Sequence, residues 1–286
     1  MSATRSALKR PAFALRALAV HAALLAAAAV GLAPFLWMCC AAFKRPEDVF
    51  GSAFLPPHPL HDLTPGNFAM LFHSTPFARW LLNSLFVSST QTVLVVTFSS
   101  LGGFALAKYR FRGKKPLLGL MLLTLVLPAL ALLPGAYLLM YDFGWINSYA
   151  AIIVPGSVSV LGMFLFRQAM LSVPDDLLHA ARVDGCSEIR IWWEIALPIV
   201  RPMVGAYTLL SFLGAWNSYL WPQVVLQDQA KFTLPIGLAG MLSLPEYQTQ
   251  YGVLMAGTLL SVLPVMLLFF VLQKDFVSGL ASGAIK

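Results

Sequence analysis

The sequence SVPDDLLHAARVDGCSEIRIWWEIALPIVRP, residues 172–202, is the longest charged interval in an otherwise apolar chain. Long uncharged runs lie on both sides of it. We call this segment the elbow. Its charged residues, with the flanking Arg167, are Asp175, Asp176, Arg182, Asp184, Glu188, Arg190, Glu194 and Arg201.

The first half of the elbow is predicted to be a short helix that ends in a tight turn. Ser172 can cap the helix, and Pro174 suits its first turn. Asp175 and Asp176 then lie at the positive end of the helix dipole. The Asp-Gly pair at 184–185 has the chemistry of a turn, in which Gly185 can take a positive φ.

The second half is predicted to restart as a helix at Ser187 and Glu188, delimited by Pro198 and Pro202. Each short helix has an apolar side. Ala180, Ala181 and Gly185 are small, so another surface could approach the turn closely. Two interpretations fit this pattern: a knob on which another protein docks, or an amphipathic segment that lies on lipid.

Composition places most of the chain in a membrane. Of 286 residues, 59% are hydrophobic and 11% charged, against roughly 45–50% and about 25% in soluble domains. Six runs contain no Asp, Glu, Lys or Arg, and each is long enough for the ~20 residues of a membrane helix. The runs are 17–43, 80–107, 116–141, 143–166, 202–227 and 247–273, with the fourth and sixth spans set at about 146–166 and 249–273.

The basic residues predict the orientation. Most of the 19 Lys and Arg residues fall before the first span, in 108–115, in 167–201 and after the last span. Only Lys44, Arg45, Arg79 and Lys231 fall on the other side. The positive-inside rule therefore puts both termini and the elbow in the cytoplasm. This asymmetry accounts for the net charge of +7, and we infer no nucleic-acid binding from it.

The fold class that follows is an all-α polytopic membrane protein. It has six transmembrane helices, both termini in the cytoplasm and a cytoplasmic helix-turn-helix loop at 172–202. The predicted parts are an N-terminal tail at 1–16, a membrane domain at 17–273 and a C-terminal tail at 274–286. The first run is too long for the core of a cleavable signal peptide, so a retained span is expected.

The longest outer segment, 44–79, is rich in proline and has no periodic core, so we expect a cap rather than a domain. His58, His61 and Asp62 make an incomplete ligand set, and no metal site is predicted there.

Two spans carry polar residues that could face a translocation path. The second contains Ser88 to Thr92, including Gln91, and later Ser99, Ser100, Gly102 and Gly103. Small and hydroxyl residues serve close helix packing or line a water-filled path, and the packing interpretation is favoured. The fifth contains Asn217, Ser218 and Tyr219, where an asparagine needs a partner or a cavity. A path and a helix-to-helix hydrogen bond both remain open.

No motif for catalysis is present. The only Gly-Lys pair, Gly113-Lys114, lacks the first glycine of a phosphate-binding loop. Cys39, Cys40 and Cys186 form no paired-cysteine metal spacing or disulfide framework. The chain is therefore not expected to hydrolyse ATP, and no catalytic residue, metal or cofactor is predicted in it.

The elbow resembles the cytoplasmic loop of ABC-importer permeases, whose pattern is roughly E-A-A-x-x-D-G-A followed by L-P. Here it reads H-A-A-R-V-D-G-C, with Leu197-Pro198 after it. The order of further motifs is similar to that of the maltose-type carbohydrate-uptake permeases. These motifs are WLLNS (80–84), FLFRQ (164–168), FLGAWNSYLWP (212–222), TLPIGL (233–238) and FVSGLASGAIK (276–286).

The resemblance implies that the elbow couples the chain to an ATPase, through His179, Ala180, Ala181, Asp184, Gly185, Leu197 and Pro198. Two residues depart from the family pattern. His179 stands at the position of an acid that helps dock the ATPase in the family, and Cys186 stands at an alanine position.

The resemblance further implies an importer of a carbohydrate or related polar solute in a bacterial-type inner membrane. Its partners would be a second related permease, two copies of an ATPase that holds ATP and magnesium, and an external solute-binding protein reached by the 227–250 loop. Pro235, Gly237, Gly240 and Pro245 favour a non-helical excursion there, although a plain connection is also consistent.

Two other functions remain as alternatives. An ion-coupled secondary transporter commonly carries ionisable residues in its spans, and none occurs here. A non-transporting membrane scaffold is favoured only by His179.

Overall fold

The computed structural model describes residues 9–52, 54–55, 58, 62–243 and 250–284. The regular secondary structure in these ranges is helical, and instead of a strand there is one isolated antiparallel bridge between Lys44 and Leu63. The chain divides into two compact units. Unit 1 comprises residues up to Thr75 and Leu242–Leu260, and unit 2 comprises Pro76–Met241 and the residues from Ser261 onward.

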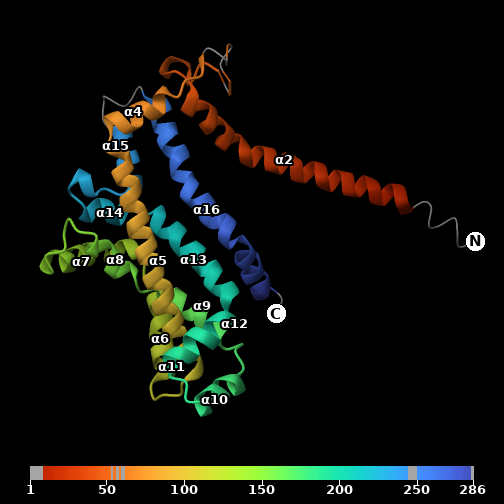
Figure 1. The fold of residues 1–286 in the computed structure, drawn as a ribbon, viewed down its shortest axis with the longest axis vertical. Helices are drawn as coiled ribbons and strands as arrows, with labels where there is room; N and C mark the ends of the chain where they lie inside the picture. The colour runs from red at the N-terminus through yellow and green to blue at the C-terminus, as the bar shows by residue number, and fades with distance from the viewer. Residues whose placement is uncertain (1–8, 53, 56–57, 59–61, 244–249, 285–286) are drawn as a thin grey trace, which may run out of the picture. The chain divides into compact units, whose positions relative to one another are not determined.

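Figure 1 shows the elements along the chain. Unit 1 contains α2 (Lys9–Phe43), η1 (Pro46–Asp48), α4 (Gly66–Ser74) and the start of α16 (Tyr251–Ala284). The elements of unit 2 are α5 (Phe77–Lys108), α6 (Lys114–Thr124), α7 (Ala129–Asp142), α8 (Ala150–Gly156), α9 (Val160–Met170), α10 (Asp175–Val183), α11 (Glu188–Ile191), the π-helix η2 (Trp192–Ala196), α12 (Leu197–Ile199), α13 (Arg201–Trp216), α14 (Leu220–Val225), η3 (Gln229–Lys231), α15 (Leu234–Ser243, of which the last two residues fall in unit 1) and the rest of α16.

Unit 1 contains buried polar contacts made by Asn67 and Lys44. The Asn67 side-chain amide donates to the carbonyls of Ala42 and Lys44 at 2.9 and 2.7 Å. The fully buried Lys44 ammonium donates to the Ser52 carbonyl at 2.6 Å. These bonds satisfy main-chain carbonyls at the C-terminal end of α2 and in the irregular chain after it, as buried backbone requires.

Unit 2 is built around α5, which packs against α9 and α13. The contact with α9 is close because α5 carries Gly102 and Gly103 there. A Cβ at Gly102 would lie 2.7 Å from the Met163 sulfur, and one at Gly103 would lie 2.5 Å from Phe166 Cβ. Ser99 and Ser100 on the same helix are buried. The packing interpretation of these small residues is therefore confirmed.

Among the residues that the structure describes, four helices are long and apolar enough to cross a membrane: Arg16–Phe43, Phe77–Lys108, Ala150–Met170 and Tyr251–Asp275. Two bent pairs raise the number to six if each pair is one span. Lys114–Thr124 and Ala129–Asp142 meet at 100°, and the helix ending at Ile199 meets Arg201–Trp216 at 88°. The first break falls at Pro128, which cannot donate the hydrogen bond that would continue α6.

The prediction of a non-helical excursion in the 227–250 loop is wrong for the part that the structure describes. Pro235 and Gly237 lie inside helix α15. Pro235 is in the first turn, where its missing N–H costs little. Gly237 is required by packing, because a Cβ there would lie 2.2 Å from the Trp80 ring. Pro245 lies outside the described residues.

Gly103→Ala should destabilise unit 2, because the added methyl group would overlap Phe166 and the Arg167 amide nitrogen. Overpacking of this kind costs about 1–3 kcal/mol. We expect a lower melting temperature in detergent. The matched control is Gly135→Ala in α7, where the added Cβ meets nothing within 4 Å. Equal melting temperatures for the two variants would contradict the close packing of α5 on α9.

Candidate functional site

The elbow consists of α10, a turn at 184–186 and the stretch α11–η2–α12 (Figure 1). Gly185 has φ of 81°, as predicted. The second helix starts at Glu188 as predicted, and the Ser187 hydroxyl caps it by accepting from the Arg190 N–H. The prediction for Ser172 is wrong: its hydroxyl donates to the Ala169 carbonyl at the end of α9, and Pro174 occupies the cap position of α10.

Pro198 also differs from the prediction. It lies within α12 rather than ending the second helix, which breaks instead at Val200, where φ is −96° and ψ is 19°. The residues before it form the π-helix η2, a rare conformation that is frequent at functional sites.

The apolar side of the elbow rests on protein. Its Leu178, Ile191 and Trp192 are buried in one cluster with Phe104 of α5 and Met170 of α9. Leu178 and Ile191 are at most 1% exposed. The elbow is therefore packed onto the ends of α5 and α9 through these residues, whereas its Leu177, Ile189 and Trp193 are exposed.

Two consecutive residues at the end of α5 hold the two halves of the elbow. The Lys108 ammonium donates to the Val173 carbonyl at 2.6 Å and to the Asp175 carboxylate at 2.7 Å, at the start of α10. The Tyr109 hydroxyl donates to the Glu188 carboxylate, at the start of α11. The C-terminal end of α5 is thus hydrogen-bonded to the elbow on both sides of the turn at 184–186.

Glu188 also closes the elbow on itself. Arg182 of α10 donates to both carboxylate oxygens, from Nε at 2.7 Å and from Nη2 at 3.1 Å. Such a bidentate pair is directional as well as strong.

These bonds shift the pKa values of the groups that make them. The Arg182 hydrogen bond, and then that of Tyr109, lowers the pKa of Glu188. Burial, and then the Glu188 hydrogen bond, raises the pKa of Tyr109, so the phenol remains a donor. The Lys108 hydrogen bond lowers the pKa of Asp175. Because both carboxyl pKa values are lowered, this stabilisation is present above the ordinary carboxyl range and is lost as the pH falls through the lowered values.

The residues predicted to couple the chain to an ATPase lie mainly on the outside of the elbow. His179, Ala180, Asp184, Gly185 and Pro198 are exposed. Ala181 is buried against the cluster, and Leu197 is half-buried. The structure therefore presents a surface in this place and anchors it from beneath.

The residues predicted to line a path lie in two separate places. Gln91 packs against α8, where its amide occupies the position that a Cβ of Gly156 would take. Asn217, Ser218 and Tyr219 form the break between α13 and α14. No hydrogen bond joins Gln91 to these three in the part of the chain that the structure describes.

A small hollow of about 260 Å³ lies where α5, the elbow and α13 meet. Two of its lining residues, Thr92 and Trp192, carry buried polar atoms without a hydrogen-bond partner. The lining residues are Thr92, Val93, Val96, Thr97, Ser100, Trp192, Trp193, Leu197, Val204 and Thr208. No local pattern in the sequence indicated that α5 and the elbow meet here.

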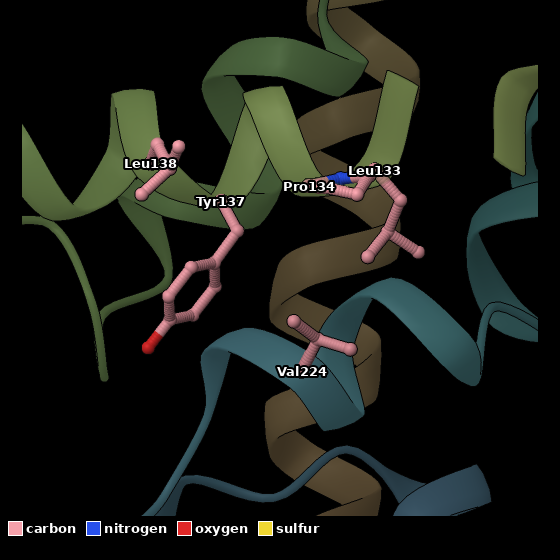
Figure 2. Close-up of a pocket in the computed structure, with 5 residues that line it drawn as sticks. All are labelled: Leu133, Pro134, Tyr137, Leu138 and Val224. Carbon is pink, nitrogen blue, oxygen red and sulfur yellow. The ribbon is translucent and has the colours of Figure 1, made fainter. Parts of the chain in front are cut away.

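A larger hollow, of about 640 Å³, lies between α7 and α14. Figure 2 shows Leu133, Pro134, Tyr137 and Leu138 on α7 and Val224 on α14. Its lining is almost wholly apolar, with the Tyr137 hydroxyl as the one side-chain polar group. A hydrophilic solute would find too few hydrogen-bond partners there.

No group of three or more potential metal ligands occurs among the described residues. His58 is exposed, and His61 lies outside the described residues.

Comparison with known families decides the identity of the chain. The model of the family "Binding-protein-dependent transport system inner membrane component" matches residues 99–281, which include the whole elbow. The chain belongs to this family. It is a permease subunit of a binding-protein-dependent importer and a multi-pass protein of the inner membrane.

Named relatives of this permease are also permeases. It is 35% identical over 258 residues to the arabinooligosaccharides transport system permease protein AraQ of Halalkalibacterium halodurans, covering 90% of this chain and 92% of that protein. It is 33% identical over 266 residues to the lactose transport system permease protein LacG of Rhizobium radiobacter, covering 91% and 93%. The sn-glycerol-3-phosphate transport system permease protein UgpE of Yersinia pestis is 33% identical over 211 residues, covering 74% and 75%.

A solved structure shares the fold. A bacterial ABC transporter involved in the import of the acidic polysaccharide alginate aligns with a TM-score of 0.80, covering 91% of this permease and 97% of that chain. The sequence identity is 23%, so this likeness concerns the fold alone.

The sequence did not predict the roles of Lys108, Tyr109 and Glu188. The contacts of α5 with the elbow join residues that are distant in sequence: Lys108 and Asp175 are 67 residues apart, and Tyr109 and Glu188 are 79 apart. The one available signal was that Lys108 and Tyr109 directly follow a long uncharged run.

Glu188→Gln should loosen the elbow, because glutamine keeps the size but not the charge that binds Arg182. Glu188 and Arg182 are 44% and 31% exposed, so solvent screening reduces the loss to about 1 kcal/mol. We expect about fivefold faster amide hydrogen exchange in 176–192. Glu194→Gln is the control, since Glu194 pairs only with Arg190 on an exposed helix surface. Equal exchange in the two variants would refute the bracing role of Glu188.

Proposed function

We propose that this permease forms half of the membrane pore of an ABC importer for a carbohydrate or a related polar solute. The named relatives support the solute class, since their names refer to arabinooligosaccharides, lactose, maltodextrin and sn-glycerol-3-phosphate. The solute itself stays open. The absence of arginine and lysine from the six uncharged runs favours a neutral ligand over an anionic one held by this subunit.

The topology that we propose has six spans, with each of the two bent helix pairs contributing to one span. Both termini and the elbow lie in the cytoplasm, as the positive-inside rule predicts. The tails at 1–16 and 274–286 then flank a membrane domain at 17–273.

The observation that carries the proposal is the double attachment of the elbow to α5. A force on the elbow reaches α5 through Lys108 at one side of the turn and through Tyr109 at the other. Helix α5 in turn packs tightly on α9 and α13, so a displaced elbow has to move the centre of unit 2. The coupling residues are His179, Ala180, Ala181, Asp184, Gly185, Leu197 and Pro198.

The remaining partners follow from this assignment. A second homologous permease would complete the pore, two ATPase copies would supply ATP hydrolysis with magnesium, and an external binding protein would deliver the solute. A transporter with a similar fold was solved in complex with an alginate pentasaccharide-bound periplasmic protein, which supports the last partner. This chain itself would bind no cofactor. Asn217, Ser218, Tyr219 and Gln91 are our candidates for residues near the path.

The alternatives are less well supported. An ion-coupled transporter would need an ionisable relay in its spans, and family membership points instead to ATP-driven import. A non-transporting scaffold would not require the attachment of the elbow to α5 through both Lys108 and Tyr109.

Affinity purification of the tagged chain from its own membranes in mild detergent should recover an ATPase and a second six-helix permease. An unrelated tagged membrane protein from the same cells serves as the control. A captured binding protein can then be screened for its sugar ligand by calorimetry. Reproducible recovery of well-folded chain alone would refute the importer assignment.

Gly185→Pro should abolish ATP-coupled uptake while membrane insertion persists. Proline fixes φ near −65°, whereas Gly185 has φ of 81°, and its N–H donates to the Arg182 carbonyl. Gly144→Pro is a matched control: Gly144 has φ of 67° and donates to the Tyr141 carbonyl, but lies outside the elbow. Asp184→Lys, which reverses a charge on the turn, should act like Gly185→Pro. Normal uptake by both elbow variants in reconstituted vesicles would rule out the lever role.

A further inference from the structure

A charged hollow of about 400 Å³ lies beside the elbow, between α10 and the residues that follow α5. Its floor is the buried side chain of Leu178. The charged and polar residues that line it are Lys108, Arg110, Asp175, His179 and Arg182. Basic groups therefore outnumber the single acid in the lining.

Two of the basic residues are already neutralised within the chain. Lys108 is bound to Asp175, and Arg182 is bound to Glu188. The other two retain their binding capacity. Arg110 makes no side-chain hydrogen bond or ion pair to any residue that the structure describes, and His179 has one contact, at 3.5 Å to Arg182. Both are exposed and belong to different segments.

We propose that this hollow receives an acidic side chain of the ATPase subunit, held between Arg110 and His179. The proposal rests on the proposed function and specifies the chemistry of its docking surface. His179 would then be a partner for a carboxylate, so the ATPase surface facing it would be acidic. Arg110 and His179 lie near enough to Asp175 to help lower the pKa of that carboxyl, but neither is hydrogen-bonded or ion-paired to it. A carboxylate entering here therefore meets a guanidinium with no hydrogen bond or ion pair to a described residue, an arrangement that gives charge complementarity across an interface.

The surroundings favour a protein over an anionic membrane surface. Asp176 and Asp184 lie on the same helical segment, are exposed and make no ion pair among the described residues. They would be repelled by a uniformly negative layer of headgroups. A folded partner can place its carboxylate at Arg110 and avoid these acids. The elbow also exposes Val183, at 87%, which fits an interface that combines apolar and charged contacts.

The first test uses the complete transporter, purified in neutral detergent through a tag on this chain. Retention of the ATPase is measured as the salt concentration rises. We expect Arg110→Glu and His179→Glu each to weaken retention at least fivefold and to reduce its dependence on salt. Arg112→Glu is the matched control, because it makes the same charge change in the same loop but Arg112 does not line the hollow.

The second test identifies the group that enters the hollow. Arg110→Lys keeps the positive charge and introduces an amine, which a carbodiimide links only to a carboxylate that touches it. Peptide mapping should find an amide bond to an Asp or Glu of the ATPase. Arg112→Lys should give no such product.

Three outcomes would overturn the proposal. The first is equal retention by the Arg110→Glu, His179→Glu and Arg112→Glu variants. The second is a cross-link that never reaches the ATPase. The third is an effect of Arg110→Glu that requires anionic lipid vesicles and is absent in neutral detergent, which would assign the hollow to lipid headgroups. Failure of the unchanged chain to retain any ATPase would instead refute the proposed function itself.

Discussion

The close approach of α5 and α9 at Gly102 and Gly103 is the constraint on which unit 2 depends. Inside a bilayer, helices gain little from hiding apolar surface from one another, so contact area and hydrogen bonds must hold them together. Two adjacent glycines let Met163 and Phe166 lie directly against the α5 backbone. The end of α9 leads straight into the elbow, so this contact also fixes where the elbow begins.

The elbow combines a buried foundation with an exposed working surface. Leu178, Ile191 and Trp192 anchor it on α5 and α9, whereas a Cβ added at Gly185 in the turn would meet no atom within 4 Å. Lys108 and Tyr109 then attach the two halves separately. A turn held only by its apolar side could rock on that surface. Attachment at both sides makes the elbow and the end of α5 move as one body, which a lever requires.

The basic residues around the elbow fall into two groups: those paired with acids of this chain and those available to a partner protein. Arg182 and Lys108 neutralise Glu188 and Asp175, and these pairs fix the shape of the elbow. Arg110 and His179 have no comparable partner within the described chain. The pairing of two basic residues thus decides which others are available to a partner protein. A substitution of Glu188 or Asp175 would change both the shape of the docking surface and its charge.

The sequence by itself determined the membrane class, the long uncharged runs and the turn at Gly185. Each follows from local chemistry: charges avoid lipid, and only glycine takes a positive φ without strain. Its motifs also led to the family. The prediction that Ser172 caps the first helix of the elbow was wrong. The glycines of 234–243 were predicted to lie in a non-helical loop, but they lie in a helix, where Gly237 leaves room for the Trp80 ring. Only the tertiary structure decided that Tyr109 meets Glu188 and that Arg110 and His179 line one hollow, because these pairs join segments about 70 to 80 residues apart. No local pattern encodes such a contact, since it exists only once α5 and α9 have packed.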